Sequence, residues 1–176
     1  MQTRRHLFLI GFMGCGKSYW GRKLAVSLGV PCMDLDEQIV RMVGKSIPEI
    51  FSSEGEAAFR YYENQALLKL DGLATQTIIA TGGGTPCFGN NMAIMQNLGA
   101  IVYLQTAPQL LLKRLEPERE QRPLLAVLDR ADLEAFLLEK LMEREPFYLQ
   151  ATHVLQQLTG QEDLLPELTR IFYSEL

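Results

Sequence analysis

The sequence has few cysteines, no long apolar run and no excess of positive charge. Its 176 residues include three cysteines, an odd number without metal-ligand spacing, which argues against a disulfide scaffold or a zinc site. Reduced thiols in a cytoplasmic protein fit this composition best. The apolar run Leu7–Ile10 is too short to cross a bilayer, or to form a signal peptide after Arg4 and Arg5, so we expect no membrane partner.

The charge balance excludes another class of partner. A net charge of −4 disfavours a protein that holds nucleic acid through backbone electrostatics. Hydrophobic residues at 47% and charged residues at 22% are typical of a globular protein, and no repeat or linker divides the chain. We therefore expect one domain over residues 1–176, in which His6 and His153 are structural.

Short apolar runs alternate with longer amphipathic ones, the pattern of an α/β protein with a parallel sheet covered by helices. We expect strands at Leu7–Ile10, Pro31–Leu35, Thr77–Thr81, Ala100–Leu104 and His153–Gln157. We expect helices at 17–28, after the capping sequences beginning at Ser46 and Thr106, at 56–70, around Leu133–Leu141 and from about Glu162.

A glycine-rich loop lies between the first expected strand and helix. Residues 11–18, Gly-Phe-Met-Gly-Cys-Gly-Lys-Ser, match the pattern G-x-x-x-x-G-K-[ST] at every fixed position. Its backbone N–H groups would converge on phosphate oxygens, Lys17 would neutralise the transferred phosphate, and the Ser18 hydroxyl would bind Mg²⁺. We predict that the nucleotide contacts Gly11, Gly14, Cys15, Gly16, Lys17, Ser18 and Tyr19.

Two acids follow the second expected strand. Asp34 and Asp36 would face the same side of an extended chain, roughly 7 Å apart. One acid could then act on Mg²⁺ while the other accepts a hydrogen bond from a nucleophilic hydroxyl. The alternative is a solvated strand end or a helix cap.

Glycine and arginine residues suggest a pocket for an acceptor. The run Gly82–Gly84 follows a buried strand and lets the backbone approach a ligand closely. Arg60, which Glu63 could hold, and Arg144 would together suit a carboxylate, although surface ion pairing is the alternative for either arginine.

A charged segment without helical period, about residues 116–130, could close over the site as a lid. It contains Arg119, Arg122 and Arg130, and Arg114 before it could stack on a nucleotide base. A solvated charged loop is the alternative interpretation of this segment.

Taken together, these motifs resemble the shikimate kinase family nearly end to end. The similar stretches are residues 11–18, Asp34-Leu35-Asp36, Phe59–Glu63, Gly82–Gly84, Arg122-Pro123-Leu124-Leu125, and Arg144 with Pro146 and Tyr148. The resemblance implies a P-loop fold like that of nucleoside monophosphate kinases, a three-layer sandwich with a five-stranded parallel sheet in the order 2-3-1-4-5, helices on both faces and a lid. It also implies ATP-dependent phosphorylation of the shikimate 3-hydroxyl, with Mg²⁺ as cofactor.

The resemblance also implies roles for individual residues. By position, Asp34 resembles the Mg²⁺-associated acid, Asp36 the shikimate-contacting acid and candidate base, Arg60 and Arg144 the carboxylate binders, Gly82, Gly83 and Gly84 the residues beside the ring, Arg122 the lid arginine that reaches the phosphates, and Arg114 the residue against adenine. Tyr19 stands where the family usually has threonine, and residues 153–161 differ from its usual Asp-Thr ending, which leaves the adenine contacts open.

Three functions are therefore open. The first is a monomeric shikimate kinase whose partners are shikimate and ATP. The second is a P-loop kinase of another carboxylated metabolite, such as a gluconate-type sugar acid. The third is a catalytically silent nucleotide-binding regulator on the same fold.

Overall fold

The computed structural model describes residues 6–117 and 130–175. The strands are β1 (His6–Ile10), β2 (Cys32–Asp34), β3 (Thr77–Ala80), β4 (Gly99–Thr106) and β5 (His153–Gln157). The helices are α1 (Lys17–Leu28), α2 (Leu35–Val43), α3 (Ile47–Ser53), α4 (Gly55–Lys69), α5 (Asn91–Leu98), α6 (Pro108–Leu115), α7 (Arg130–Tyr148) and α8 (Leu165–Glu175), with short 3₁₀ turns at Leu70–Gly72 and Thr85–Cys87.

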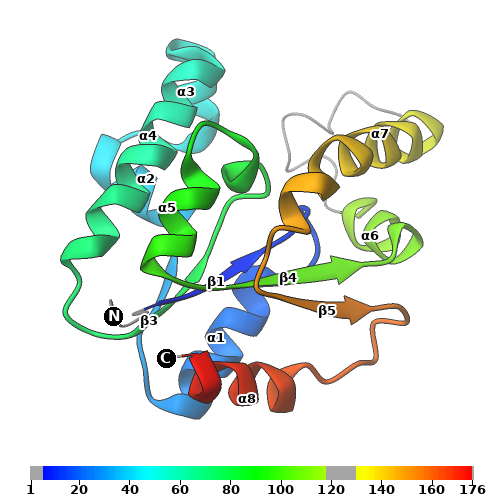
Figure 1. The fold of residues 1–176 in the computed structure, drawn as a ribbon. Coiled ribbons are helices and arrows are strands. Elements are labelled where there is room, and N and C mark those ends of the chain that lie inside the picture. Colours follow the sequence, from blue (N-terminus) through cyan, green and yellow to red (C-terminus); the bar gives the residue numbers. More distant parts are fainter. Residues whose placement is uncertain (1–5, 118–129, 176) are drawn as a thin grey trace.

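The five strands form one parallel sheet in the order β2-β3-β1-β4-β5, which confirms the expected topology. Helices α1 and α8 cover one face, and α5 and α7 cover the other (Figure 1). Because every strand runs the same way, the loops after β1 and β3 emerge side by side at the carboxyl edge of the sheet. Ligands of open α/β sheets bind at that edge.

The core explains why the central strands are apolar along their whole length. Residues 7–10 of β1 and 101–104 of β4 are almost completely buried, since helices pack on both faces of the sheet. A continuous cluster of buried side chains extends from these strands to helices on both sides. This packing gives the loops at the sheet edge a rigid support.

Several details differ from the sequence-based expectations, among them the helices α2 and α5, which were not expected. The capping box at Ser46 is present, but α6 begins after Ala107, so the predicted cap at Thr106 is wrong. Strand β4 extends to Thr106, whose hydroxyl accepts a hydrogen bond from the Gln157 amide at 3.0 Å. The last helix begins at Leu165 rather than near Glu162, because the Glu162 carboxylate instead binds N–H groups of the preceding loop.

Helix α7 continues through Pro146 to Tyr148, so Arg144 lies in its penultimate turn. Most of the predicted lid falls outside the described residues, Arg119 and Arg122 included. Within residues 6–117 and 130–175, none of the helices combines the length and the apolar character that crossing a bilayer requires.

Candidate active site

The glycine-rich loop joins β1 to α1 at the carboxyl edge of the sheet. Gly14 has φ +80° and Gly16 has φ +94°, a region that side chains other than glycine rarely adopt. A Cβ at Gly14 would also lie 3.1 Å from Leu115. Gly16 has no side chain to cap α1, and the first turn carries no acid, which leaves the N–H groups and the positive helix end for an anion.

Lys17 is buried beneath this loop. Its Nζ donates to the carbonyl oxygens of Gly11 at 2.8 Å and of Phe12 at 3.0 Å, and lies 3.6 Å from the Cys15 sulfur. Cys15 is completely buried, in agreement with a packing role for that side chain. The ammonium group is therefore held at the loop, where phosphate oxygens would replace the carbonyl acceptors.

Ser18 and Asp34 meet beside the loop. The Ser18 hydroxyl donates to Oδ2 of Asp34 at 2.7 Å, and Oδ1 of Asp34 accepts from the backbone N–H of Asp36 at 3.0 Å. Asp34 is thus the N-cap of α2 as well as a partner of the phosphate loop. The expectation that Asp36 continues an extended strand is wrong, and the alternative of a helix cap is confirmed for Asp34, because α2 begins at Leu35.

Asp36 is a half-buried acid within the first turn of α2, and its Oδ1 is shielded from solvent. Among the described residues, no group donates a hydrogen bond to its Oδ1. Burial raises the pKa of Asp36 from 3.8 to about 6, and the neighbouring Asp34 and Glu63 add to the rise, against the opposing effect of Lys17 and Arg60. A carboxylate with a free acceptor atom and a pKa near neutrality can orient a hydroxyl and accept its proton.

This pKa predicts a pH dependence. Asp36 must be ionised to accept a proton, so kcat/KM for the acceptor should fall by about tenfold for each pH unit below about 6. Initial rates at saturating nucleotide across the acid range test this expectation. Thermal unfolding at each pH is the control for loss of fold, and a flat profile through pH 6 in folded protein would contradict the role of Asp36.

Arg60 is held on several sides. Its Nη1 donates to Oε2 of the fully buried Glu63 at 2.6 Å, and its Nη2 to the Glu56 carboxylate at 2.9 Å. The Thr85 hydroxyl donates to the other oxygen of Glu63 at 2.6 Å. The guanidinium carbon lies 3.9 Å from the centre of the Phe88 ring, an arrangement that favours a cation.

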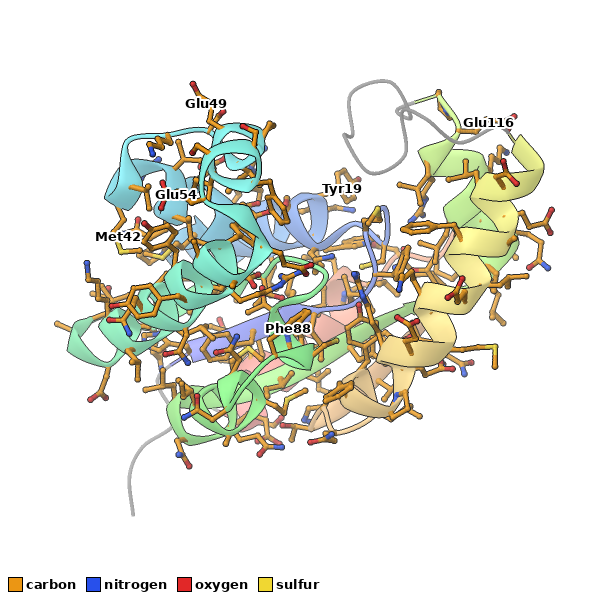
Figure 2. All side chains as sticks on the ribbon, turned by 90° about the horizontal axis from the view of Figure 1, so that it is seen from above. Tyr19, Met42, Glu49, Glu54, Phe88 and Glu116 are labelled. Atoms are coloured by element: carbon orange, nitrogen blue, oxygen red, sulfur yellow. The ribbon has the colours of Figure 1, made fainter. Side chains whose placement is uncertain are left out.

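Sequence reasoning found Arg60 and Glu63 but missed their supports, Thr85 and Phe88. Neither residue carries a motif in the sequence beyond its closeness to the triple glycine. Figure 2 shows Phe88 between the block formed by α3 and α4 and the block formed by α6 and α7.

The triple glycine makes room for the side chains of the site. A Cβ at Gly82 would lie 3.1 Å from Asp36 Oδ1 and 3.0 Å from Glu63 Oε1, and one at Gly84 would lie 2.8 Å from Arg60 Nη1. The backbone of Gly82–Gly84 does not enter the positive-φ region, so space rather than turn geometry requires glycine here. These contacts place the triple glycine, Asp36 and Arg60 in one site.

Arg144 reaches the same site from α7. Its guanidinium carbon lies 5.4 Å from the centre of the Phe12 ring, and its Nη1 would lie 3.5 Å from a Cβ at Gly83. Tyr148, one turn further along α7, donates its hydroxyl to the Gly83 carbonyl at 2.5 Å. The helix, the triple glycine and the phosphate loop therefore meet at Gly83.

Two neighbouring cavities occupy this edge of the sheet. One, of about 340 Å³, is lined by Lys17, Ser18, Asp34, Asp36, Gly82 and Gly83 among others. The other, of about 640 Å³, is lined by Trp20, Lys23, Gln157 and the loop at 160–163. Gly14, Gly16, Tyr19 and Arg114 line both. Tyr19 is 62% exposed and lies between the block formed by α3 and α4 and the block formed by α6 and α7 (Figure 2).

An ammonium group beneath a glycine-rich loop, with a half-buried acid across a small cavity, defines a P-loop kinase that acts on a small molecule. A model of the shikimate kinase family matches residues 13–170, and the chain belongs to this family. The activity of this chain is the ATP-dependent phosphorylation of shikimate.

Individual relatives agree with this assignment. A shikimate kinase of Bacteroides fragilis is 40% identical over 148 residues, 84% of this chain and 82% of its own length. A crystal structure of shikimate kinase from Bacteroides thetaiotaomicron superposes with a TM-score of 0.87 at 35% identity, covering 96% of this chain and 98% of its own. The shikimate kinase of Acinetobacter baumannii in complex with shikimate has a TM-score of 0.83 at 33% identity, covering 98% of this chain and 93% of its own.

Proposed function

We propose that this chain transfers the γ-phosphoryl group of ATP to the 3-hydroxyl of shikimate, giving shikimate 3-phosphate and ADP for chorismate and aromatic amino-acid biosynthesis. The observation that carries the assignment of residue roles is Asp36, which lines the cavity beside the phosphate loop and whose Oδ1 has no donor among the described residues. The Acinetobacter baumannii relative's complex with shikimate supports the acceptor.

Ser18 and Asp34 fit a Mg²⁺ ion. Their oxygens lie 2.7 Å apart at the edge of the phosphate loop, and hydroxyl and carboxylate oxygens are ligands that this ion prefers. The part of the chain that the structure describes contains no group of three or more histidine, cysteine or acidic residues that could hold a metal. Two protein ligands suit Mg²⁺ because it binds with substrate phosphates and water, and when bound it neutralises phosphate charge.

The described side chains divide the remaining tasks. Lys17 exchanges its two carbonyl acceptors for phosphate oxygens, and Asp36 orients the acceptor hydroxyl and takes its proton. Arg60 and Arg144 bind the shikimate carboxylate on the two sides of the triple glycine. The family resemblance implies that Arg122 reaches the phosphates, but Arg122 lies outside the described residues.

We assign the adenine of ATP to the cavity of about 640 Å³, in which Arg114 lies against the base. The cavity adjoins the phosphate loop and shares Gly14 and Gly16 with the smaller one, so a nucleotide that fills it places its phosphates beside Lys17. Gly11, Cys15 and Tyr19 complete the proposed contacts of the nucleotide.

The substrate assignment is tested by ADP release in a coupled assay with ATP and Mg²⁺. Release should depend on shikimate, and should stay at background with a gluconate-type sugar acid. Turnover only with the sugar acid would support the second function considered from the sequence. Release that is flat with and without either acid would support the silent regulator.

The arginine assignment predicts a selective loss of acceptor affinity. Arg60→Lys keeps a positive charge but loses the bidentate fork, so shikimate should bind at least about tenfold more weakly while ADP binds unchanged. Isothermal titration of each ligand measures both affinities. Arg41→Lys on α2, an exposed arginine that pairs with Glu37, is the matched control, and equal shikimate affinity in the two variants would remove Arg60 from the site.

We also propose a monomer in the cytoplasm. The three cysteines are free, which supports a reducing compartment.

A further inference from the structure

Gln157, the last residue of β5, makes an unusual set of buried contacts. Its side chain is only 2% exposed, and its amide Nε2 donates to the Cys15 carbonyl at 2.7 Å and to the Thr106 hydroxyl at 3.0 Å. Its backbone carbonyl accepts from the N–H of Ala107 at 2.9 Å. A buried amide held by three elements has one orientation, so Gln157 is a rigid link between the end of β5 and the phosphate loop.

The other end of the same amide faces Arg114. The Gln157 Oε1 accepts from Nη2 of Arg114 at 3.4 Å, while Nη1 of Arg114 donates to the Gly14 carbonyl at 3.0 Å. Arg114 is thus tied to the phosphate loop twice, directly through Gly14 and indirectly through Gln157 and Cys15. Both residues line the larger cavity.

The hydrogen-bond acceptor that Arg114 meets at Gln157 is an amide oxygen rather than a carboxylate. An amide oxygen holds a guanidinium group without neutralising it, whereas a carboxylate at the same place would form an ion pair and would repel the Cys15 carbonyl. Arg114 therefore keeps its positive charge for a ligand in the cavity.

The loop after Gln157 supplies another wall of this cavity. The Glu162 carboxylate accepts from the backbone N–H groups of Leu158, Thr159 and Gly160 at 2.7 to 2.9 Å. Backbone hydrogen bonds, that from Thr159 first, lower the pKa of Glu162 to about 2. A Cβ at Gly160 would lie 3.0 Å from Leu110 and 3.6 Å from Arg114 Nη2. The loop at Gly160 therefore packs against α6 beside Arg114.

We propose that Gln157 is a positioning residue for the nucleotide. It fixes Arg114 relative to the phosphate loop, and therefore fixes the position of the base relative to the phosphates. The proposal rests on the proposed nucleotide site. A long amide here spans the distance between the end of β5 and the phosphate loop.

Gln157→Met tests the proposal, since methionine fills a similar volume without strong hydrogen bonds. We expect ADP to bind about tenfold more weakly and the KM for ATP to rise by the same factor, with kcat and shikimate affinity nearly unchanged. Gln156→Met is the matched control, because Gln156 is the neighbouring residue, is exposed and bonds to Gln105 on the solvent side. It should leave ADP binding unchanged.

A double-mutant cycle separates positioning from a general structural role. If Gln157 acts through Arg114, Gln157→Met should weaken ADP binding much less in an Arg114→Met background than in the wild type. Additive effects, equal losses of ADP and shikimate affinity, or unchanged ADP affinity would overturn the proposal.

The wild-type protein provides the reference for the proposed function itself. Wild-type protein that binds ADP and turns over shikimate, with a silent Gln157→Met, refutes only the positioning role, whereas wild-type protein that binds no ADP refutes the nucleotide site. Should Gln157→Met not fold, Gln157→Glu keeps the acceptor for Arg114 and loses both donors, and it should weaken ADP binding at least as much.

Discussion

Replacing Asp36 by asparagine is expected to lower turnover by about 100- to 10,000-fold, the range that general-base catalysis contributes, while ADP binding stays within about twofold of the wild type. Asparagine keeps the shape and an acceptor oxygen but cannot take the proton of the shikimate hydroxyl. Coupled ADP release measures turnover, and isothermal titration measures ADP binding. Turnover within a few-fold of the wild type would remove Asp36 from the mechanism.

The same substitution has a second, opposite effect on stability. The pKa of Asp36 rises from 3.8 to about 6 on folding, so the folded state binds a proton more tightly than the unfolded state does. The stabilisation that this proton gives the folded state is fully present below about pH 3.8 and is lost as the pH rises through about 6. Asparagine has no charge to bury. At pH 7.5 the free energy of unfolding of Asp36→Asn should therefore exceed that of the wild type, by up to about 3 kcal/mol.

This pairing of effects separates catalysis from folding. An inactive variant that unfolds at a higher temperature has lost chemistry, whereas an inactive variant that unfolds earlier has lost structure. Glu37→Gln is the matched control, since Glu37 is the next residue on α2 but is exposed and pairs with Arg22. It should change neither turnover nor ADP affinity.

Lys17→Met is expected to lower turnover by about 100- to 1,000-fold and to weaken ADP binding by about tenfold or more. Methionine retains the apolar stem but has no charge to place on the transferred phosphate. Its thioether also leaves the Gly11 and Phe12 carbonyls without the donor that Lys17 supplies, which costs about 1 to 3 kcal/mol of stability.

Single-turnover kinetics and ADP titration measure the two effects of Lys17→Met. Lys69→Met, at the exposed end of α4, removes a lysine far along the chain from the phosphate loop and should affect neither measurement. Equal turnover in the two variants would contradict the assignment of Lys17.

Features set by short-range interactions were predictable from the sequence. The motif at residues 11–18 specifies its own conformation, because Gly14 and Gly16 are needed where φ is positive. The capping box at Ser46 is likewise complete within four residues. The strand order agreed with the resemblance, whose motifs lie at the strand ends.

Features that depend on distant neighbours were missed or assigned wrongly. One error is local instead: Asp34 and Asp36 were expected to share one face of an extended strand, but Asp34 forms the helix cap that was the alternative interpretation, and α2 begins at Leu35. Thr106 was expected to cap α6, yet it continues β4 and accepts from Gln157, which lies 51 residues away. The hydrogen bonds of Glu63 show the same pattern, with Thr85 arriving from 22 residues along the chain.

The sequence by itself determined the phosphate loop, the alternation of strands and helices, and the identity of the acids and arginines that we propose for the substrate site. These are local properties, written in glycine positions, capping residues and the period of apolar side chains. Only the tertiary structure decided that the pKa of Asp36 is raised, that Phe88 lies against Arg60, and that Gln157 ties Arg114 to the loop. Burial, ion pairing and buried hydrogen bonds each need groups from separate strands and helices, and packing alone brings those groups together.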